Sequence, residues 1–125
     1  MINIFDPKEY VRSLLMDSTI INVTGDKTVH FIHADSPLAP YVEYEFYDEN
    51  GSAYEEGKEV ETNFYLQVDI FSKGSYTKLE AAIKNKLLNA GFDRGMAADL
   101  YENETQLYHK AMRFIFSINN SEGDG

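Results

Sequence analysis

The chain has 125 residues, a net charge of −10 and no cysteine. A chain of this length is expected to fold as one domain and can bury enough apolar surface for a stable core. The missing cysteines exclude disulfides, thiolate metal sites and a cysteine nucleophile. No run approaches the roughly 20 apolar residues of a membrane span, and the N-terminus lacks a signal-peptide pattern. We therefore expect a cytoplasmic protein with no membrane partner.

The charge is unevenly distributed along the chain. Residues 1–72 contain 14 acidic and 4 basic residues, whereas residues 73–118 contain 5 acidic and 7 basic residues. An acidic surface repels nucleic acid unless basic side chains cluster locally, and the sequence shows no Lys/Arg cluster. We therefore expect no sequence-specific nucleic-acid binding.

The first helix is expected to begin at Asp6 and to end near Asp17 or Ser18. Asp6 suits the N-cap, Pro7 fits the first helical position, and Glu9 can complete a capping box. The predicted buried stripe consists of Tyr10, Val11, Leu14 and Leu15.

Residues 19–33 have weaker patterns. Their first half carries three β-branched residues that favour extended structure, Ile20, Ile21 and Val23. A turn is expected at residues 24–27 and a short strand over residues 28–33. The two prolines of residues 35–40 then predict a loop, because proline fits neither a strand ladder nor a helix interior.

Apolar and polar side chains alternate along residues 41–47, which predicts a strand. With the extended segments expected in residues 19–33, two or three strands precede residue 48. One predicted face carries Val42, Tyr44 and Phe46. The other, wetter face carries Tyr41, Glu43, Glu45 and Tyr47.

An acidic loop is predicted over residues 48–59. Asn50-Gly51 is a strong turn signal. A connection of about a dozen residues is longer than a tight hairpin requires, and such loops are usually functional or disordered. Residues 43–61 contain 8 acidic residues and one Lys. The candidate interaction residues of this loop are Asp48, Glu49, Tyr54, Glu55, Glu56 and Glu59.

Residues 63–92 are expected to form the strand and helix around which the domain is organised. One face of the strand carries Phe64, Leu66, Val68 and Ile70. An apolar stripe with helical spacing follows, made of Tyr76, Leu79, Ile83, Leu87 and Ala90. Ser75 or Thr77 can cap the start of the helix, and Gly91 can end it in the left-handed conformation.

Two more strands are expected, at residues 96–102 and 107–118. Strands without regular helical crossovers favour an antiparallel sheet. The predicted fold class is therefore α+β, a mostly antiparallel sheet of about four to five strands with two helices packed on one face. Residues 1–118 are expected to form a single domain, and the polar, Gly-rich residues 119–125 are expected to be a flexible tail.

The three histidines of the chain are candidate metal ligands or catalytic groups. His30 and His33 would point to opposite faces of a strand, so they form a metal site with Asp35 only if a loop brings the three together. An ordinary surface or edge position is the commoner role for such residues. We expect no metal and no cofactor.

His109 and Asp69 are the remaining candidates for catalysis. His109 is expected near Glu102 or Glu104, where a carboxylate–histidine pair acts as a general base or, more often, is a simple cross-strand contact. Asp69 is expected on the wetter face of its strand or beside a base on a neighbouring strand, such as Lys110 or Arg113. No phosphate-binding loop, Gly-x-Ser-x-Gly or His-Glu-x-x-His motif is present, so we expect no catalytic residue.

The chain has 9 Tyr and 8 Phe but no Trp. The exposed face of the sheet is predicted to carry the candidate interaction residues Tyr41, Tyr47, Tyr65 and Tyr101. Tyrosine is favoured at protein–protein contacts because its ring is large and its hydroxyl tolerates water. These side chains either form such a contact or simply cover the second face of the sheet, and the sequence leaves both interpretations open.

Three segments carry a family pattern. The first is residues 65–72 with the short turn and helix through Leu87, the second is residues 98–102 with residues 108–114, and the third is residues 37–44. Together they cover most of residues 1–118 and resemble the tail terminator, or tail completion, proteins of long-tailed bacteriophages and prophages. That divergent family has no invariant catalytic motif.

The resemblance implies a mixed sheet flanked by helices and a non-enzymatic role. Members of the family assemble into a ring, usually a hexamer, that caps the tail tube and offers a surface to the head connector. The implied partners are copies of the chain itself, the tail tube protein and the head connector protein. The implied location is the virion, at the head–tail interface, with the host cytoplasm as the site of assembly.

The acidic loop matches no motif of that family. We expect it to face either the lumen of the ring, where negative charge repels passing DNA, or the rim, where it docks a basic partner. Two alternatives from other classes stay open. One is an acidic adaptor or DNA mimic that binds a basic protein, and the other is a small enzyme centred on His109.

Overall fold

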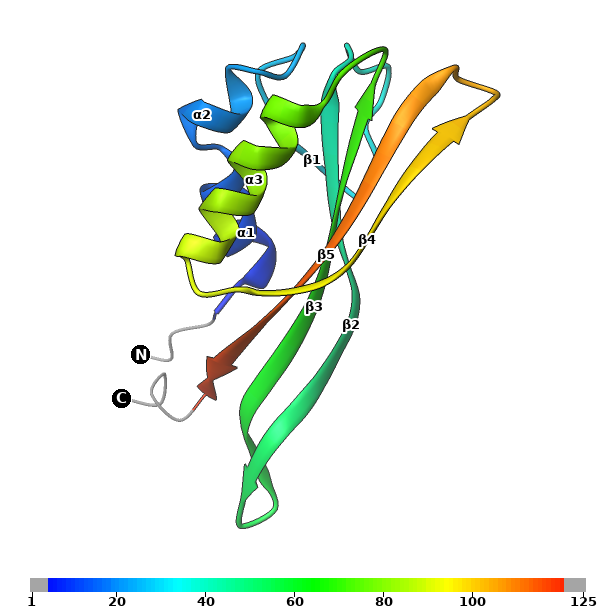
Figure 1. The fold of residues 1–125 in the computed structure, drawn as a ribbon. Coiled ribbons are helices and arrows are strands. Elements are labelled where there is room, and N and C mark those ends of the chain that lie inside the picture. The colour runs from blue at the N-terminus through cyan, green and yellow to red at the C-terminus, as the bar shows by residue number, and fades with distance from the viewer. Residues whose placement is uncertain (1–4, 121–125) are drawn as a thin grey trace.

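The computed structural model describes residues 5–120 and contains a five-stranded sheet in the order β1-β2-β3-β5-β4 (Figure 1). The strands are β1 (His30–Phe31), β2 (Tyr41–Glu55), β3 (Lys58–Ser72), β4 (Asp93–Glu102) and β5 (Leu107–Asn119). The helices α1 (Pro7–Leu15), α2 (Ser18–Ile21) and α3 (Thr77–Asn89) all lie on one face of the sheet. β1 is parallel to β2, and the other pairs are antiparallel. The predicted α+β class is confirmed, while residues 121–125 of the predicted tail lie outside the described residues.

Helix α1 begins as the sequence predicts. The Asp6 carboxylate accepts hydrogen bonds from the backbone amides of Lys8 (3.0 Å) and Glu9 (3.4 Å), which satisfies two amides that have no partner within the helix. Val11 and Leu15 are fully buried against the sheet. α1 ends at Leu15, a little before the predicted boundary.

Helix α2 corrects the extended structure expected for Ile20 and its neighbours. The Asp17 carboxylate accepts from the Thr19 amide (2.9 Å) and hydroxyl (2.7 Å), and this cap starts a turn of helix that buries Ile20. Bonds from Thr19 and from Lys86 lower the pKa of Asp17 from 3.8 to about 2. The capping geometry therefore outweighs the strand preference of the β-branched residues.

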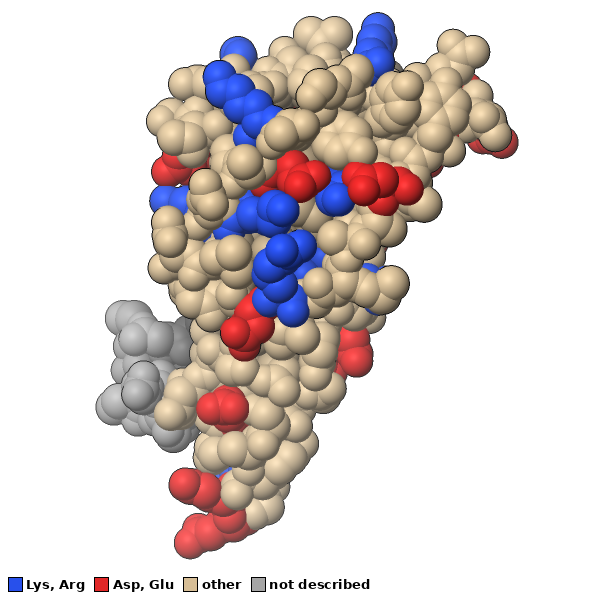
Figure 2. Space-filling view, viewed as in Figure 1, with Lys and Arg blue, Asp and Glu red and all other residues tan. Residues whose placement is uncertain are grey.

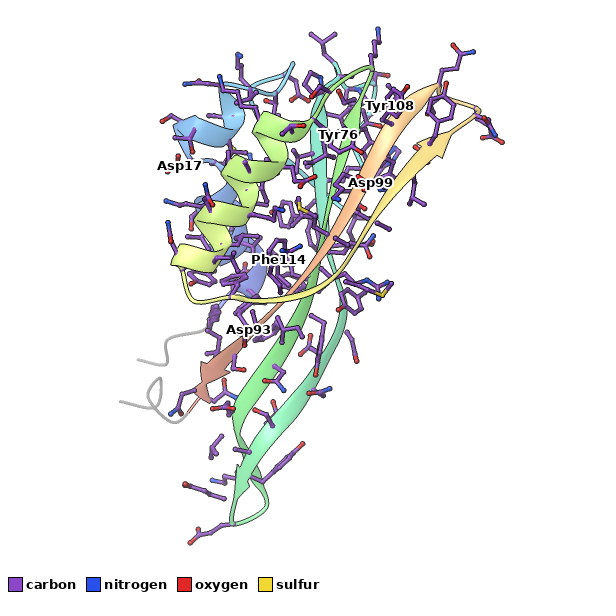
Figure 3. The ribbon with its side chains drawn as sticks, viewed as in Figure 1. Asp17, Tyr76, Asp93, Asp99, Tyr108 and Phe114 are labelled. Atoms are coloured by element: carbon purple, nitrogen blue, oxygen red, sulfur yellow. The ribbon has the colours of Figure 1, made fainter. Side chains whose placement is uncertain are left out.

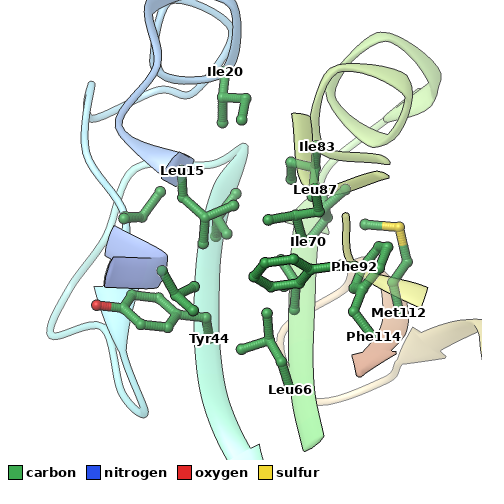
Figure 4. Close-up of a cluster of buried hydrophobic side chains, with 14 of the residues drawn as sticks. Leu15, Ile20, Tyr44, Leu66, Ile70, Ile83, Leu87, Phe92, Met112 and Phe114 are labelled. Carbon is green, nitrogen blue, oxygen red and sulfur yellow. The ribbon is translucent and has the colours of Figure 1, made fainter. Parts of the chain in front are cut away.

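The core lies between the helices and the inner face of the sheet (Figure 4). Leu79, Ile83 and Leu87 of α3 are buried, as the helical stripe predicts. The covered face of the sheet contributes Val42, Tyr44, Leu66, Val68, Ile70, Met112 and Phe114. Gly91 ends α3 with φ of 94°, and the Phe92 amide donates to the Leu87 carbonyl oxygen (3.0 Å), as in a glycine-terminated helix.

The predicted acidic loop is wrong, because residues 48–59 are part of a continuous β-hairpin. β2 and β3 pair as far as Glu55 and Lys58, and Glu56-Gly57 make the turn with φ of 51° and 77°. Two successive positive φ values are typical of a type I′ hairpin turn. Asn50-Gly51, the predicted turn, lies within β2. We call residues 48–61 the hairpin arm, and β5 pairs with β3 only as far as Glu61.

The turn of the β4–β5 hairpin lies at the other end of the sheet from the hairpin arm, and side-chain contacts join this hairpin to α3 and to Tyr76 before it (Figures 1 and 3). The Tyr76 hydroxyl donates to the Asp99 carboxylate (2.6 Å), and the Lys110 ammonium lies 3.1 Å from Asp99 and 3.5 Å from Glu80. The hydrogen bond to Asp99 raises the pKa of Tyr76 to about 12. These contacts hold β4 in place at the edge of the sheet.

Candidate functional site

No helix of residues 5–120 covers the face of the sheet opposite the helices, which we call the open face (Figure 1). The loop before β2 reaches its β2 end, where the Ala34 amide donates to the Glu43 carboxylate (2.8 Å). The strand registers place side chains from four strands on it. They are Tyr41, Glu43, Glu45, Tyr47, Tyr65, Gln67, Asp69, Phe71, Ala98, Leu100, His109, Ala111, Arg113 and Ile115. The open face is therefore mixed in character, with acidic, cationic, aromatic and apolar groups side by side.

A chain of polar contacts crosses the open face. His109 Nε2 lies 2.7 Å from Asp69 Oδ1, and Gln67 Nε2 donates to the same oxygen (3.0 Å). Arg113 Nε donates to Gln67 Oε1 (3.0 Å), and the Arg113 guanidinium lies 4.2 Å from the centre of the Tyr47 ring. Neighbouring side chains leave only 6% of Asp69 exposed although no helix covers it. Its carboxylate is thus held in a fixed position with its charge compensated.

The predicted partner of His109, Glu102 or Glu104, is wrong. β4 places Leu100 opposite His109 and Glu102 opposite Leu107, so the nearest carboxylate comes from Asp69 on the other neighbouring strand. The hydrogen bond and charge of Asp69 raise the pKa of His109 above 6.5 although burial opposes this. The His109 ring also stacks on Phe71, with ring centres 4.3 Å apart.

A shallow groove of about 220 Å³ lies on the open face over β4 and β5. Ala98 and Ala111 are cross-strand partners and form its floor, since their side chains are small. His109 with Leu100 forms one wall. The other wall and the end consist of Arg113, Met96 and Gln67. We call this feature the open-face groove.

The predicted exposed tyrosines divide between the two sides of the sheet. Tyr41 stacks on Phe71 (4.8 Å), and Tyr47 lies 5.9 Å from Tyr65, so these three tyrosines lie on the open face as expected. The expected face of Tyr101 is wrong. Its ring packs 5.2 Å from Tyr108, which lies on the same side of β5 as the α3-facing Lys110. Alternation along β4 therefore puts Leu100 rather than Tyr101 on the open face.

The other predicted residues are scattered. His30 pairs with Asp26 (2.6 Å) instead of converging with His33 and Asp35. Among residues 5–120, no three His, Cys, Asp or Glu side chains gather as metal ligands would. In the structure described, no helix has the length and apolar character needed to cross a membrane.

The hairpin arm carries the other predicted interaction residues. Among the described residues, Asp48, Glu49, Glu55 and Glu56 have no cationic partner. Tyr54 is 62% exposed. Glu59 is engaged by the Thr62 hydroxyl and so is turned toward the arm itself. Acidic side chains dominate the end of the arm, whereas acidic and basic side chains alternate around α3 (Figure 2).

The sequence predicts neither the open-face groove nor the role of Gln67, which joins Asp69 to Arg113. The signal for the groove is the pair of small residues Ala98 and Ala111 on strands that are otherwise rich in large side chains. This pair predicts a groove only when the register of β4 against β5 is known, because the register makes the two alanines neighbours. Compared with protein families and with curated proteins, the chain matches no family model and no curated sequence.

Proposed function

We propose that this protein is a non-enzymatic structural component of a phage or prophage tail, which assembles into a ring that ends the tail tube and joins it to the head connector. The observation that carries the proposal is the open face with its groove and its polar chain. Met96 and Leu100 expose 68% and 49% of their surface beside the groove, and apolar side chains that gather on a surface mark sites of protein–protein contact. The sequence resemblance to tail terminator proteins supports the choice of partners.

The edges of the sheet also support assembly. β4 is a ten-residue edge strand. β1 pairs with only two residues of β2, and so leaves most of the outer edge of β2 without a strand partner among the described residues. Unpaired edges offer backbone donors and acceptors to another chain. Both edges are therefore available for contacts between subunits.

In this proposal the protein acts in the virion, after assembly in the host cytoplasm. Its partners are copies of itself, in a hexamer as in the family that it resembles, the tail tube protein and the head connector protein. The hairpin arm lies at the lumen or at the rim of the ring. Its negative charge repels DNA in the lumen or attracts a basic partner at the rim.

Binding to isolated tail tubes tests the proposal. We expect the protein to sediment with the tubes, and Met96→Glu to abolish this because it places a charge on the wall of the open-face groove. Leu88→Glu is the matched control, because Leu88 is 41% exposed on α3, on the opposite side of the sheet from the groove. Equal binding by both variants would contradict a role for the open face.

The Asp69–His109 pair favours a second candidate, a small enzyme centred on His109. The pair has the geometry of a histidine oriented by a carboxylate. The groove beside it is smaller than the roughly 300–1,000 Å³ of typical ligand sites, which favours the structural role. Loss of a measurable hydrolytic or transfer activity in His109→Ala, with tube binding unchanged, would support the catalytic alternative.

A further inference from the structure

We propose that the open-face groove is a socket for the tip of the hairpin arm of a second copy of this chain, with Tyr54 inserted and with Glu55 and Glu56 beside Arg113. The inference rests on the proposed self-assembly and names the contact through which it occurs. It assigns a role to the two most unusual features of the surface, the groove and the arm.

The shape of the groove fits a side chain. Its floor is made of Ala98 and Ala111, and it is open at the β4 edge, where Met96 and Leu100 are 68% and 49% exposed. Its volume of about 220 Å³ is below that of sites for drug-sized ligands and is suited to one large aromatic side chain. An aromatic ring in such a pocket is the usual anchor of a protein–protein contact.

The charge of the groove fits an acidic partner. The Asp69 carboxylate is already engaged by His109 and Gln67. Arg113 uses only its Nε toward Gln67, and its terminal guanidinium nitrogens donate to no acceptor among residues 5–120. An incoming carboxylate can therefore form a paired, bidentate contact there without displacing an existing bond.

The tip of the arm has the complementary chemistry. Tyr54 is 62% exposed, and Glu55 and Glu56 lie next to it with no cationic partner among the described residues. The Tyr54 ring lies over Gly51 of its own strand, so its side chain has to rotate outward to enter a groove. The tip then offers one ring and two carboxylates.

The contact has to join two copies. The arm projects from one end of the sheet, and the β4–β5 hairpin projects from the other, so the tip points away from the groove of its own chain (Figure 1). Tip and groove are different surfaces, which makes the contact head-to-tail. Head-to-tail contacts generate a ring where the rotation closes, and a filament where it does not.

Engineered cysteines test the contact directly, because the chain has none of its own. We would mix purified Glu56→Cys and Met96→Cys proteins under mild oxidation and measure the disulfide-linked heterodimer. The expected result is a heterodimer well above the level formed by Glu56→Cys with Leu88→Cys, in which the second cysteine lies on α3. Equal yields of the two heterodimers would overturn the proposal.

Two substitutions provide an independent measurement. Tyr54→Ala removes the anchor, and Ala98→Phe fills the floor of the groove. Each should weaken self-association roughly 30-fold, the effect of losing a central aromatic anchor. Ala81→Phe, at an exposed position of α3, is the matched control and should leave association unchanged. Thermal unfolding of each variant confirms that it is folded.

The outcomes distinguish a failure of the proposed arm–groove contact from a failure of the proposed ring assembly. Assembly of the unmodified protein without selective cross-linking, and without response to Ala98→Phe, overturns the socket and leaves the ring proposal standing. A protein that stays monomeric alone and on tail tubes overturns both.

Discussion

The covered face and the open face of the sheet are formed by the same strands, but burial explains the residue types of only one of them. Along β3, Leu66, Val68 and Ile70 face the helices and are fully buried, while Gln67 and Asp69 alternate with them and face away. Burial of apolar area accounts for the first set. It does not account for a glutamine, a histidine and an arginine that line a groove on a face that no helix covers. The covered face therefore stabilises the fold, whereas the role in contacts that we propose for the open face is what the experiments below test.

The largest expected effect comes from breaking the covered face. Phe114 is 1% exposed at the centre of the core, so Phe114→Ala should lower the free energy of unfolding by about 3–5 kcal/mol. Denaturant titration measures this. Leu88→Ala, at an exposed position of α3, should change it by less than about 0.5 kcal/mol. Similar losses in the two variants would show that the core is placed wrongly.

A smaller effect is expected from breaking the polar chain of the open face. Asp69→Ala leaves His109 and Gln67 without their acceptor, and should cost about 1–3 kcal/mol of unfolding free energy. Glu45→Ala is the control, because Glu45 is also on the open face but has no hydrogen-bond partner among the described residues. If the two variants were equally stable, the network would not be formed in solution.

The stability contributed by His109 should depend on pH. Its pKa in the folded protein is raised above the ordinary 6.5, so its contribution is fully present below pH 6.5 and is lost as the pH rises through the folded-state pKa. The difference in unfolding free energy between the unmodified protein and His109→Gln should therefore shrink as the pH rises above 6.5. A difference that stays constant or grows with pH would contradict a His109–Asp69 ion pair.

The smallest effect on stability is expected at the tip of the arm. Glu56 is exposed and has no ion pair among residues 5–120, so Glu56→Gln should alter the unfolding free energy by less than about 0.5 kcal/mol. Self-association should weaken in the same variant, because it removes one of the carboxylates that we propose to bind Arg113 of a second copy. If Glu56→Gln lowered the unfolding free energy and left self-association unchanged, the proposed role of the arm in assembly would be contradicted.

The covered face could be predicted from the sequence because the period of the apolar residues records burial directly. Alternation in residues 64–70 and the helical stripe through Leu87 both match the core. The arm could not be predicted, because Asn50-Gly51 has a strong local preference for a turn. Continued pairing of β2 with β3 outweighs that preference and moves the turn to Glu56-Gly57.

The open face was harder to predict because it depends on register between strands. A shift of one residue moves a side chain to the other face of a sheet. The register of β4 places Leu100 rather than Tyr101 on the open face. His109 meets Asp69 because the strand order puts β5 between β3 and β4, which the sequence pattern does not reveal. The groove over Ala98 and Ala111 depends on the same register.

Mass in solution, measured by light scattering with and without tail tubes, tests the central claim most directly. Assembly through the open face predicts particles of several times the 14.3 kDa chain mass, alone or bound to tubes, that are lost in Met96→Glu and retained in Leu88→Glu. Complexes with a basic protein and no self-assembly would instead favour the acidic adaptor. A strict monomer of 14.3 kDa that never binds tubes would contradict the claim.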